Sequence, residues 1–77
     1  MPRRVFNWTA EDIVRFLKEY GFVHVHTRGS HFIYQGKHGG QPRQVSVPFH
    51  GSRVLKPRTL AGIIRQSGIP KNEWVGR

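Results

Sequence analysis

The chain has 77 residues, and its 13 Lys and Arg against only four Asp and Glu give it a formal net charge of +9. A chain of this length forms one domain and buries only about 60 to 65% of its unfolded surface, which excludes multidomain enzymes and large cofactor folds. The absence of Cys excludes disulfide frameworks and thiolate chemistry and favours a cytoplasmic location. We expect no membrane association, because no apolar run approaches the roughly 20 residues that span a bilayer.

The segment from Thr9 to Gly21 has the apolar spacing of a helix. Apolar residues recur at three- and four-residue steps, at Ala10, Ile13, Val14 and Leu17. Thr9 suits the N-cap, Asp12 completes a capping box, and Gly21 fits a left-handed C-terminal cap. Three of the four acids lie in this segment, so helix stability accounts for most of the negative charge.

Beyond Gly21 the apolar period changes to two, which predicts β-strands. In the first, Val23, Val25 and Thr27 alternate with His24, His26 and Arg28, giving one apolar and one basic face. A Gly29-Ser30 turn leads to a second strand over residues 31–35. A third strand over 44–47 follows a glycine-rich loop at 36–42. These short connections favour a three-stranded antiparallel meander.

A second helix is expected from Pro57, a residue that suits the first helical turn, to a stop at Gly68. A short final turn after Pro70 contains Trp74, which is long enough to close over the core. The order predicts an α+β domain in which two helices cover one face of the sheet. We expect a single domain over residues 1–77, with its core at about 9–75 and a short basic N-terminal extension at 1–8.

The acids offer little to a carboxylate-based or metal-based mechanism. Glu11 and Asp12 are neighbours on the helix, so their side chains diverge by about 100°. We therefore expect no metal and no cofactor. His24 and His26 have a spacing that can chelate zinc, but no third ligand is evident, and a solvated strand face is the simpler interpretation.

His31 is the candidate catalytic residue because of its setting. It follows the Gly29-Ser30 turn and begins a strand that would hold it rigidly. A free imidazole titrates near pH 6.5, by rough reference values, and so moves protons at neutral pH. On composition alone, a turn histidine that only packs or binds backbone remains the simpler interpretation.

The order and spacing of several motifs resemble the HicA (YcfA-like) family of mRNA interferase toxins. These are Gly21-Phe22, Gly29-Ser30-His31 with Tyr34, Val47-Pro48-Phe49-His50, Leu55, Thr59-Leu60 with Ile63, and Gln66-Ser67-Gly68-Ile69. The resemblance implies a fold similar to the double-stranded RNA-binding domain. It also implies a toxin that cleaves mRNA as a metal-independent endoribonuclease, a HicB-like antitoxin that masks the active site, and a catalytic role for His31.

RNA supplies its own nucleophile, the 2′-hydroxyl, so a positioned imidazole and cations are sufficient for cleavage. His31 would be the general base. His50 is a candidate acid, with Tyr34 or water as alternatives. The residues expected to contact RNA are Arg28, Gly29, Ser30, Arg43, Arg53, Lys56 and Arg58.

Two alternative functions, neither of them enzymatic, remain open. The first is a non-catalytic RNA-binding module of the same fold, which charge, size and element order fit equally well. The second is a basic protein whose charge serves chiefly to bind an acidic partner. The aromatic side chains of Phe32, Tyr34 and Phe49 are candidates for base stacking, although in so small a domain they are more often core.

Overall fold

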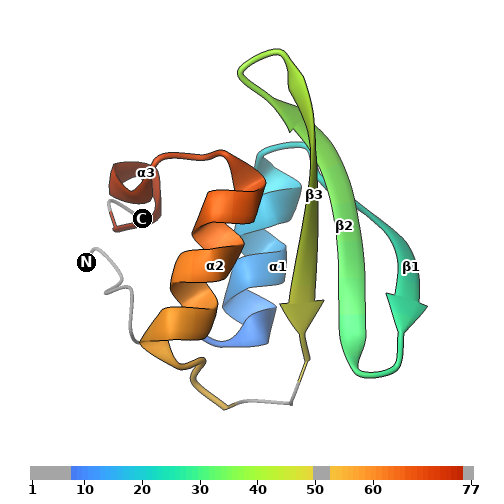
Figure 1. The fold of residues 1–77 in the computed structure, drawn as a ribbon, viewed down its shortest axis with the longest axis vertical. Helices are drawn as coiled ribbons and strands as arrows, with labels where there is room; N and C mark the ends of the chain where they lie inside the picture. The colour runs from blue at the N-terminus through green and yellow to red at the C-terminus, as the bar shows by residue number, and fades with distance from the viewer. Residues whose placement is uncertain (1–7, 50–52, 76–77) are drawn as a thin grey trace.

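The structure is a computed structural model of the chain, and it describes residues 8–49 and 53–75. The elements are α1 (Ala10–Glu19), β1 (Val23–Arg28), β2 (His31–His38), β3 (Gln41–Pro48), α2 (Pro57–Ser67) and α3 (Lys71–Val75). The strands form one antiparallel sheet in the order β1-β2-β3, and Figure 1 shows α1 and α2 side by side against one face of it. This arrangement confirms the predicted α+β fold. Within the described ranges, every helix is too short or too polar to cross a membrane.

Helix α1 begins and ends where the sequence predicts. The Asp12 N–H donates to Thr9 Oγ1 (3.2 Å) and the Thr9 N–H donates to Asp12 Oδ2 (3.1 Å), so the capping box is complete. Gly21 follows the helix with φ of +86°, a left-handed conformation that costs glycine little. The residues that α1 buries are Ala10, Ile13, Phe16 and Leu17.

The predicted loop over residues 36–42 is wrong, because β2 and β3 both continue into it. Only Gly39 and Gly40 form the turn, and His38 pairs directly with Gln41. Both glycines have positive φ (+67° and +79°), as a two-residue type I′ turn requires. The result is a long hairpin whose tip projects beyond the helices (Figure 1).

Strand β1 departs from its predicted alternation, since all six of its residues are exposed. Val23 and Val25, predicted to line an apolar face, are 59% and 42% exposed. The physical reason is the position of the helices: α1 and α2 both contact β3, at the opposite edge of the sheet. A bulge between His24 and His26 also breaks the two-residue period.

The two faces of the sheet have different environments. Tyr34, Val45 and Val47 belong to the core cluster that the helices cover, and we call their side the helix-packed face. Successive side chains on a strand point to opposite faces. His31 and Ile33 therefore lie on the other side, which we call the open face.

An aromatic cluster closes the core at the end of α3. The rings of Phe16 and Trp74 are stacked with their centroids 3.9 Å apart, and Trp8 contacts both edge-on. The Trp74 indole N–H donates to the carbonyl of Ile69 (3.3 Å). The prediction that Trp74 covers the core is thus confirmed, and this contact holds α3 in place.

Two polar side chains hold the end of α2, and one of them, Gln66, joins it to β3. Gln66 Oε1 accepts the backbone N–H of Ser46 (2.9 Å) at the edge of the sheet. The buried Ser67 hydroxyl donates to the Ile64 carbonyl and accepts the Ile69 N–H, so its polar atom is satisfied. Gly68 then ends the helix with φ of +74°. The Gln66-Ser67-Gly68-Ile69 motif, which is one of those that resemble the family, therefore has a structural role.

Candidate active site and nucleic-acid interface

His31 is the first residue of β2 and is exposed on the open face. It is preceded by a two-residue turn in which Gly29 has a φ of +60° and Ser30 does not have a positive φ. Positive φ at the first residue alone is the pattern of a type II′ turn. The turn therefore presents the imidazole at the end of a paired strand, where a substrate can reach it.

The backbone around His31 is held on both sides. The Phe49 N–H donates to the Ser30 carbonyl (2.7 Å), which extends the pairing of β2 and β3 beyond Pro48. The Phe49 ring stacks on Phe32 with centroids 4.7 Å apart. Both rings are half-buried against the core, so they support the site from the helix-packed face and are not exposed stacking platforms.

Arg28, a predicted phosphate ligand, lies beside His31 in the sheet. The two residues are direct cross-strand partners in β1 and β2. Such partners point to the same face with Cβ atoms roughly 4.5 to 5.5 Å apart. Arg28, Gly29, Ser30 and His31 are therefore brought together at one end of the open face, as the sequence analysis expects.

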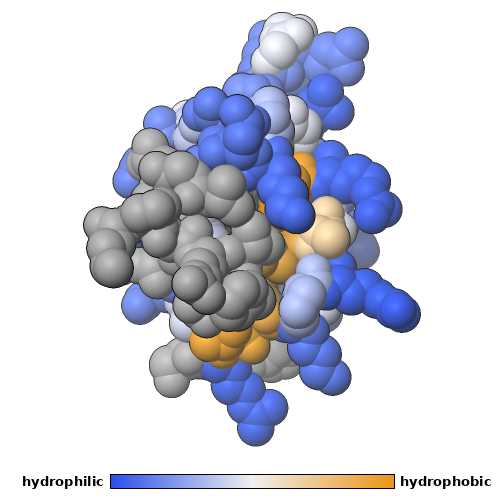
Figure 2. All heavy atoms as spheres, turned by 90° about the vertical axis from the view of Figure 1, so that its left-hand side faces the viewer, coloured by the Kyte–Doolittle hydropathy of each residue, from blue (hydrophilic) through white to orange (hydrophobic). Residues whose placement is uncertain are grey.

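Two more predicted cations lie close to this end. Arg53 and Lys56 line a cavity of about 320 Å³ together with Pro48, the β3 partner of His31. Arg58 is exposed in the first turn of α2, which follows directly. Figure 2, which views the molecule from the side of α2 and α3, shows hydrophilic side chains projecting around smaller areas of hydrophobic surface.

Arg43 is placed elsewhere. It pairs with Gly36, five residues along β2 from His31, which corresponds to about 17 Å at the usual rise per residue. Its guanidinium lies against Gly68, where an added Cβ would be 2.5 Å from Arg43 Nε. Within the described residues this Nε is buried without a hydrogen-bond partner. A cation at the end of α2 favours the helix dipole, so Arg43 has a structural role here.

The fold places Tyr34, one candidate for the general acid, away from His31. Tyr34 is 3% exposed and belongs to the core. It points to the helix-packed face, away from His31, and burial raises the pKa of its hydroxyl above 10.0. His50, the other side chain considered, lies outside the described residues.

His24 and His26 do not form the pair that their spacing suggests. Because of the bulge, His24 pairs with Tyr34 and His26 with Ile33, so the two imidazoles lie on opposite faces. His24 Nε2 is hydrogen-bonded to Thr27 Oγ1 (2.9 Å). Across residues 8–49 and 53–75 there is no group of three or more His, Asp or Glu that could hold a metal ion.

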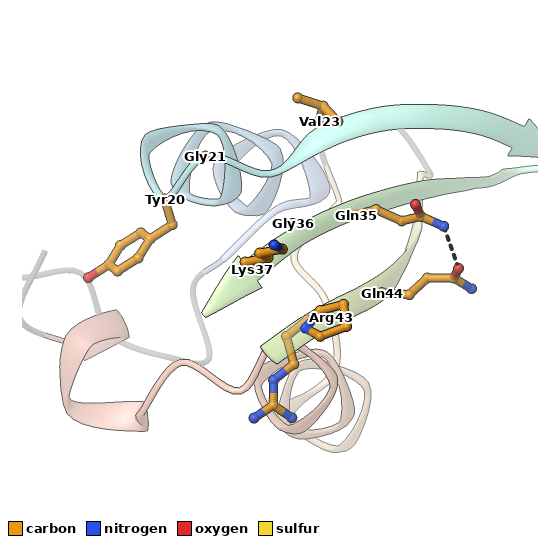
Figure 3. A pocket seen from close by; sticks show the side chains of 9 residues that line it. Tyr20, Gly21, Val23, Gln35, Gly36, Lys37, Arg43 and Gln44 are labelled. Atoms are coloured by element: carbon orange, nitrogen blue, oxygen red, sulfur yellow. Dashed lines mark hydrogen bonds between the residues drawn. The ribbon is translucent and has the colours of Figure 1, made fainter. Parts of the chain in front are cut away.

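A second hollow was missed by the sequence analysis. It has a volume of about 760 Å³ and lies at the hairpin end of the sheet, between β2, β3 and the turn after α1 (Figure 3). Lys37, Gln35 and Gln44 line it. The Gly39-Gly40 pair could have indicated it from the sequence. A type I′ turn at these two residues continues the strand through Lys37, which lines the hollow.

Comparison with protein-family models gives a match over residues 10–69 to the HicA toxin of bacterial toxin-antitoxin systems. The matched range contains the Gly29-Ser30 turn, His31 and the whole sheet. Neither curated proteins nor solved structures give a match.

Proposed function

The chain belongs to the HicA family of bacterial toxins, and on that premise we propose that it is a metal-independent endoribonuclease that cleaves mRNA with His31 as the general base. As a toxin of a toxin-antitoxin system it has an antitoxin as its partner, which we propose to be a HicB-like protein that masks His31. The observation that carries the proposal is the exposed imidazole of His31, fixed by a type II′ turn beside Arg28.

The proposed reaction uses only the substrate and this chain's own groups. His31 accepts the proton of a 2′-hydroxyl, and the 2′-oxygen attacks the adjacent phosphorus. The bond from phosphorus to the 5′-oxygen breaks, and that oxygen takes a proton from His50 or water. The products are a 2′,3′-cyclic phosphate and a 5′-hydroxyl.

Positive charge near His31 supports this chemistry. Arg28 shares its face, and Arg53 and Lys56 line the adjacent cavity. We assign Arg28 and the backbone amides of Gly29 and Ser30 to the phosphate that reacts, where charge develops in the transition state. Arg53, Lys56 and Arg58 would attract the flanking phosphates.

End chemistry on purified protein tests the proposal. The protein is incubated with an mRNA fragment, and with the same fragment carrying a 2′-deoxynucleotide at the cleaved position. We expect 2′,3′-cyclic phosphate ends, no loss of rate in EDTA, and no cleavage at the deoxynucleotide. Inhibition by EDTA or 3′-hydroxyl ends would contradict the mechanism, and binding without turnover would favour a non-catalytic RNA-binding module.

A further inference from the structure

The open face of the sheet extends along β2 from the exposed His31 and includes Ile33, whose side chain is only 6% exposed. Strand alternation places Ile33, Gln35 and Lys37 on the same face as His31, because the intervening Tyr34 points into the core. Figure 1 shows the described helices on the opposite side of the sheet. From His31 to Lys37 the face is about 20 Å long at the usual rise per residue. It therefore extends well beyond a single reacting phosphate.

The charge of this face suits a polyanion. The strands contain Arg28, Lys37 and Arg43 and no acid. All four acids of the chain lie on α1 or α3, in the helix layer. Arg28 stands at the His31 end of the open face and Lys37 at the hairpin end. A phosphate backbone laid along the face meets a cation at both ends and no repelling carboxylate from the sheet.

Between these two cations lies a pair of amides. Gln35 Nε2 donates to Gln44 Oε1 (2.9 Å), and both side chains are exposed. Figure 3 shows them reaching toward each other across β2 and β3 at the rim of the 760 Å³ hollow. The bond leaves Gln35 Oε1 as an acceptor beside a free N–H of Gln44. Such an adjacent acceptor and donor match the hydrogen-bonding edge of an unpaired base.

We propose that single-stranded RNA binds along the open face from His31 to Lys37, with Lys37 contacting a phosphate and the Gln35–Gln44 pair contacting a base. The inference rests on the proposed nuclease function and names the path of its substrate. A single strand is required because bases in a duplex are already paired. In addition, a regular A-form helix does not hold the 2′-oxygen in line with the departing 5′-oxygen.

Binding of an uncleavable RNA tests the phosphate contact. A labelled 2′-O-methyl oligonucleotide, single-stranded or annealed to its complement, is titrated with the full chain at increasing salt, using fluorescence anisotropy. We expect Lys37→Gln to weaken single-strand binding by about two- to fivefold and to reduce the slope of log K against log salt by about 0.7. The control Lys71→Gln removes an equal charge from an exposed position at the start of α3 and should change neither. Equal effects of the two variants, or tighter binding of the duplex, would overturn the proposal.

Base preference tests the amide pair. Wild-type protein, Gln44→Ala and Gln35→Ala are titrated with 2′-O-methyl oligonucleotides of one base each. We expect a preference of about fivefold or more in the wild type, the lower bound for a bidentate contact, and its loss in both variants. Gln41→Ala, which removes an exposed amide of the same strand as Gln44 on the opposite face, is the matched control and should keep it. An unchanged preference in Gln35→Ala and Gln44→Ala would contradict the assignment.

Cleavage by the wild type, scored in parallel, separates this inference from the proposed function. If RNA is not cleaved but the salt slope depends on Lys37, the nuclease proposal fails and the RNA path stands. If RNA is cleaved to cyclic phosphate ends but binding is indifferent to Lys37, Gln35 and Gln44, the nuclease stands and the path is wrong.

Discussion

The backbone of Gly36 in β2 lies directly against the ring of Phe22. A Cβ added to Gly36 would be 2.7 Å from the Phe22 Cγ atom and 3.0 Å from its Cα atom. Phe22 is 2% exposed and belongs to the core. The absence of a side chain at Gly36 thus allows the segment after α1 to pack closely on the sheet.

We expect Gly36→Ala to destabilise the protein by about 1 to 3 kcal/mol, the usual cost of overpacking a closed core. The matched control is Gly62→Ala in α2, where an added Cβ meets nothing within 4 Å. That variant should gain up to about 1 kcal/mol from helix propensity. Urea unfolding of both variants checks this, and equal midpoints would contradict the packing of Phe22.

The contact of Arg43 with Gly68 predicts a non-additive pair. Gly68→Ala should cost about 1 to 2 kcal/mol from its left-handed backbone, and more because the new Cβ meets the Arg43 guanidinium. Adding Arg43→Ala removes the clash between the new Cβ and the guanidinium. The double variant should therefore lose less free energy of unfolding than the two single variants together. Gly21→Ala is the control, since its φ is +86° but nothing lies within 4 Å. Additive losses in both pairs would show that Arg43 does not lie on Gly68.

Tyr20 and Tyr34, the chain's two tyrosines, should lose their hydroxyl protons at a higher pH in the folded protein than in the unfolded chain. The Tyr20 hydroxyl donates to Glu73 (2.5 Å), and this bond raises the pKa of Tyr20 above 10.0, as burial does for Tyr34. Well below pH 10.0 both hydroxyls are protonated in either state, so their contribution to stability is constant. Above it, the unfolded chain loses these protons first, and stability falls as the pH rises.

Tyrosinate absorbance during an alkaline titration measures this directly. The midpoint of tyrosine ionisation should lie at a higher pH in buffer than in denaturant. In Tyr20→Phe only Tyr34 should ionise, and the free energy of unfolding should fall less above pH 10.0 than in the wild type. Coincident midpoints in buffer and denaturant would contradict the Glu73 contact.

The sequence predicted the elements that have strong local signals. The capping box at Thr9 and the helix from Pro57 to Gly68 depend on neighbouring residues, and both were correct. The candidate catalytic turn was also located, because Gly29-Ser30-His31 is contiguous in sequence. The position of each of these elements depends on residues that are close together in the sequence.

The features that sequence analysis missed depend on non-local packing. The exposure of Val23 follows from helices that lie over β3, which no pattern within β1 encodes. The bulge that separates His24 from His26 follows from pairing with β2. Arg43 was grouped with the RNA ligands by its charge, whereas its contact with Gly68 brings together residues 25 positions apart.

The proposed function depends on His31 as the general base. The most direct test is the single-turnover rate of RNA cleavage by His31→Ala compared with His38→Ala, a histidine at the far end of the same strand, with circular dichroism and Tm confirming that both variants fold. We expect His31→Ala to be at least about a hundredfold slower, the lower limit for loss of a general base, and His38→Ala to cleave at close to the wild-type rate. Cleavage by His31→Ala at an undiminished rate would contradict the assignment.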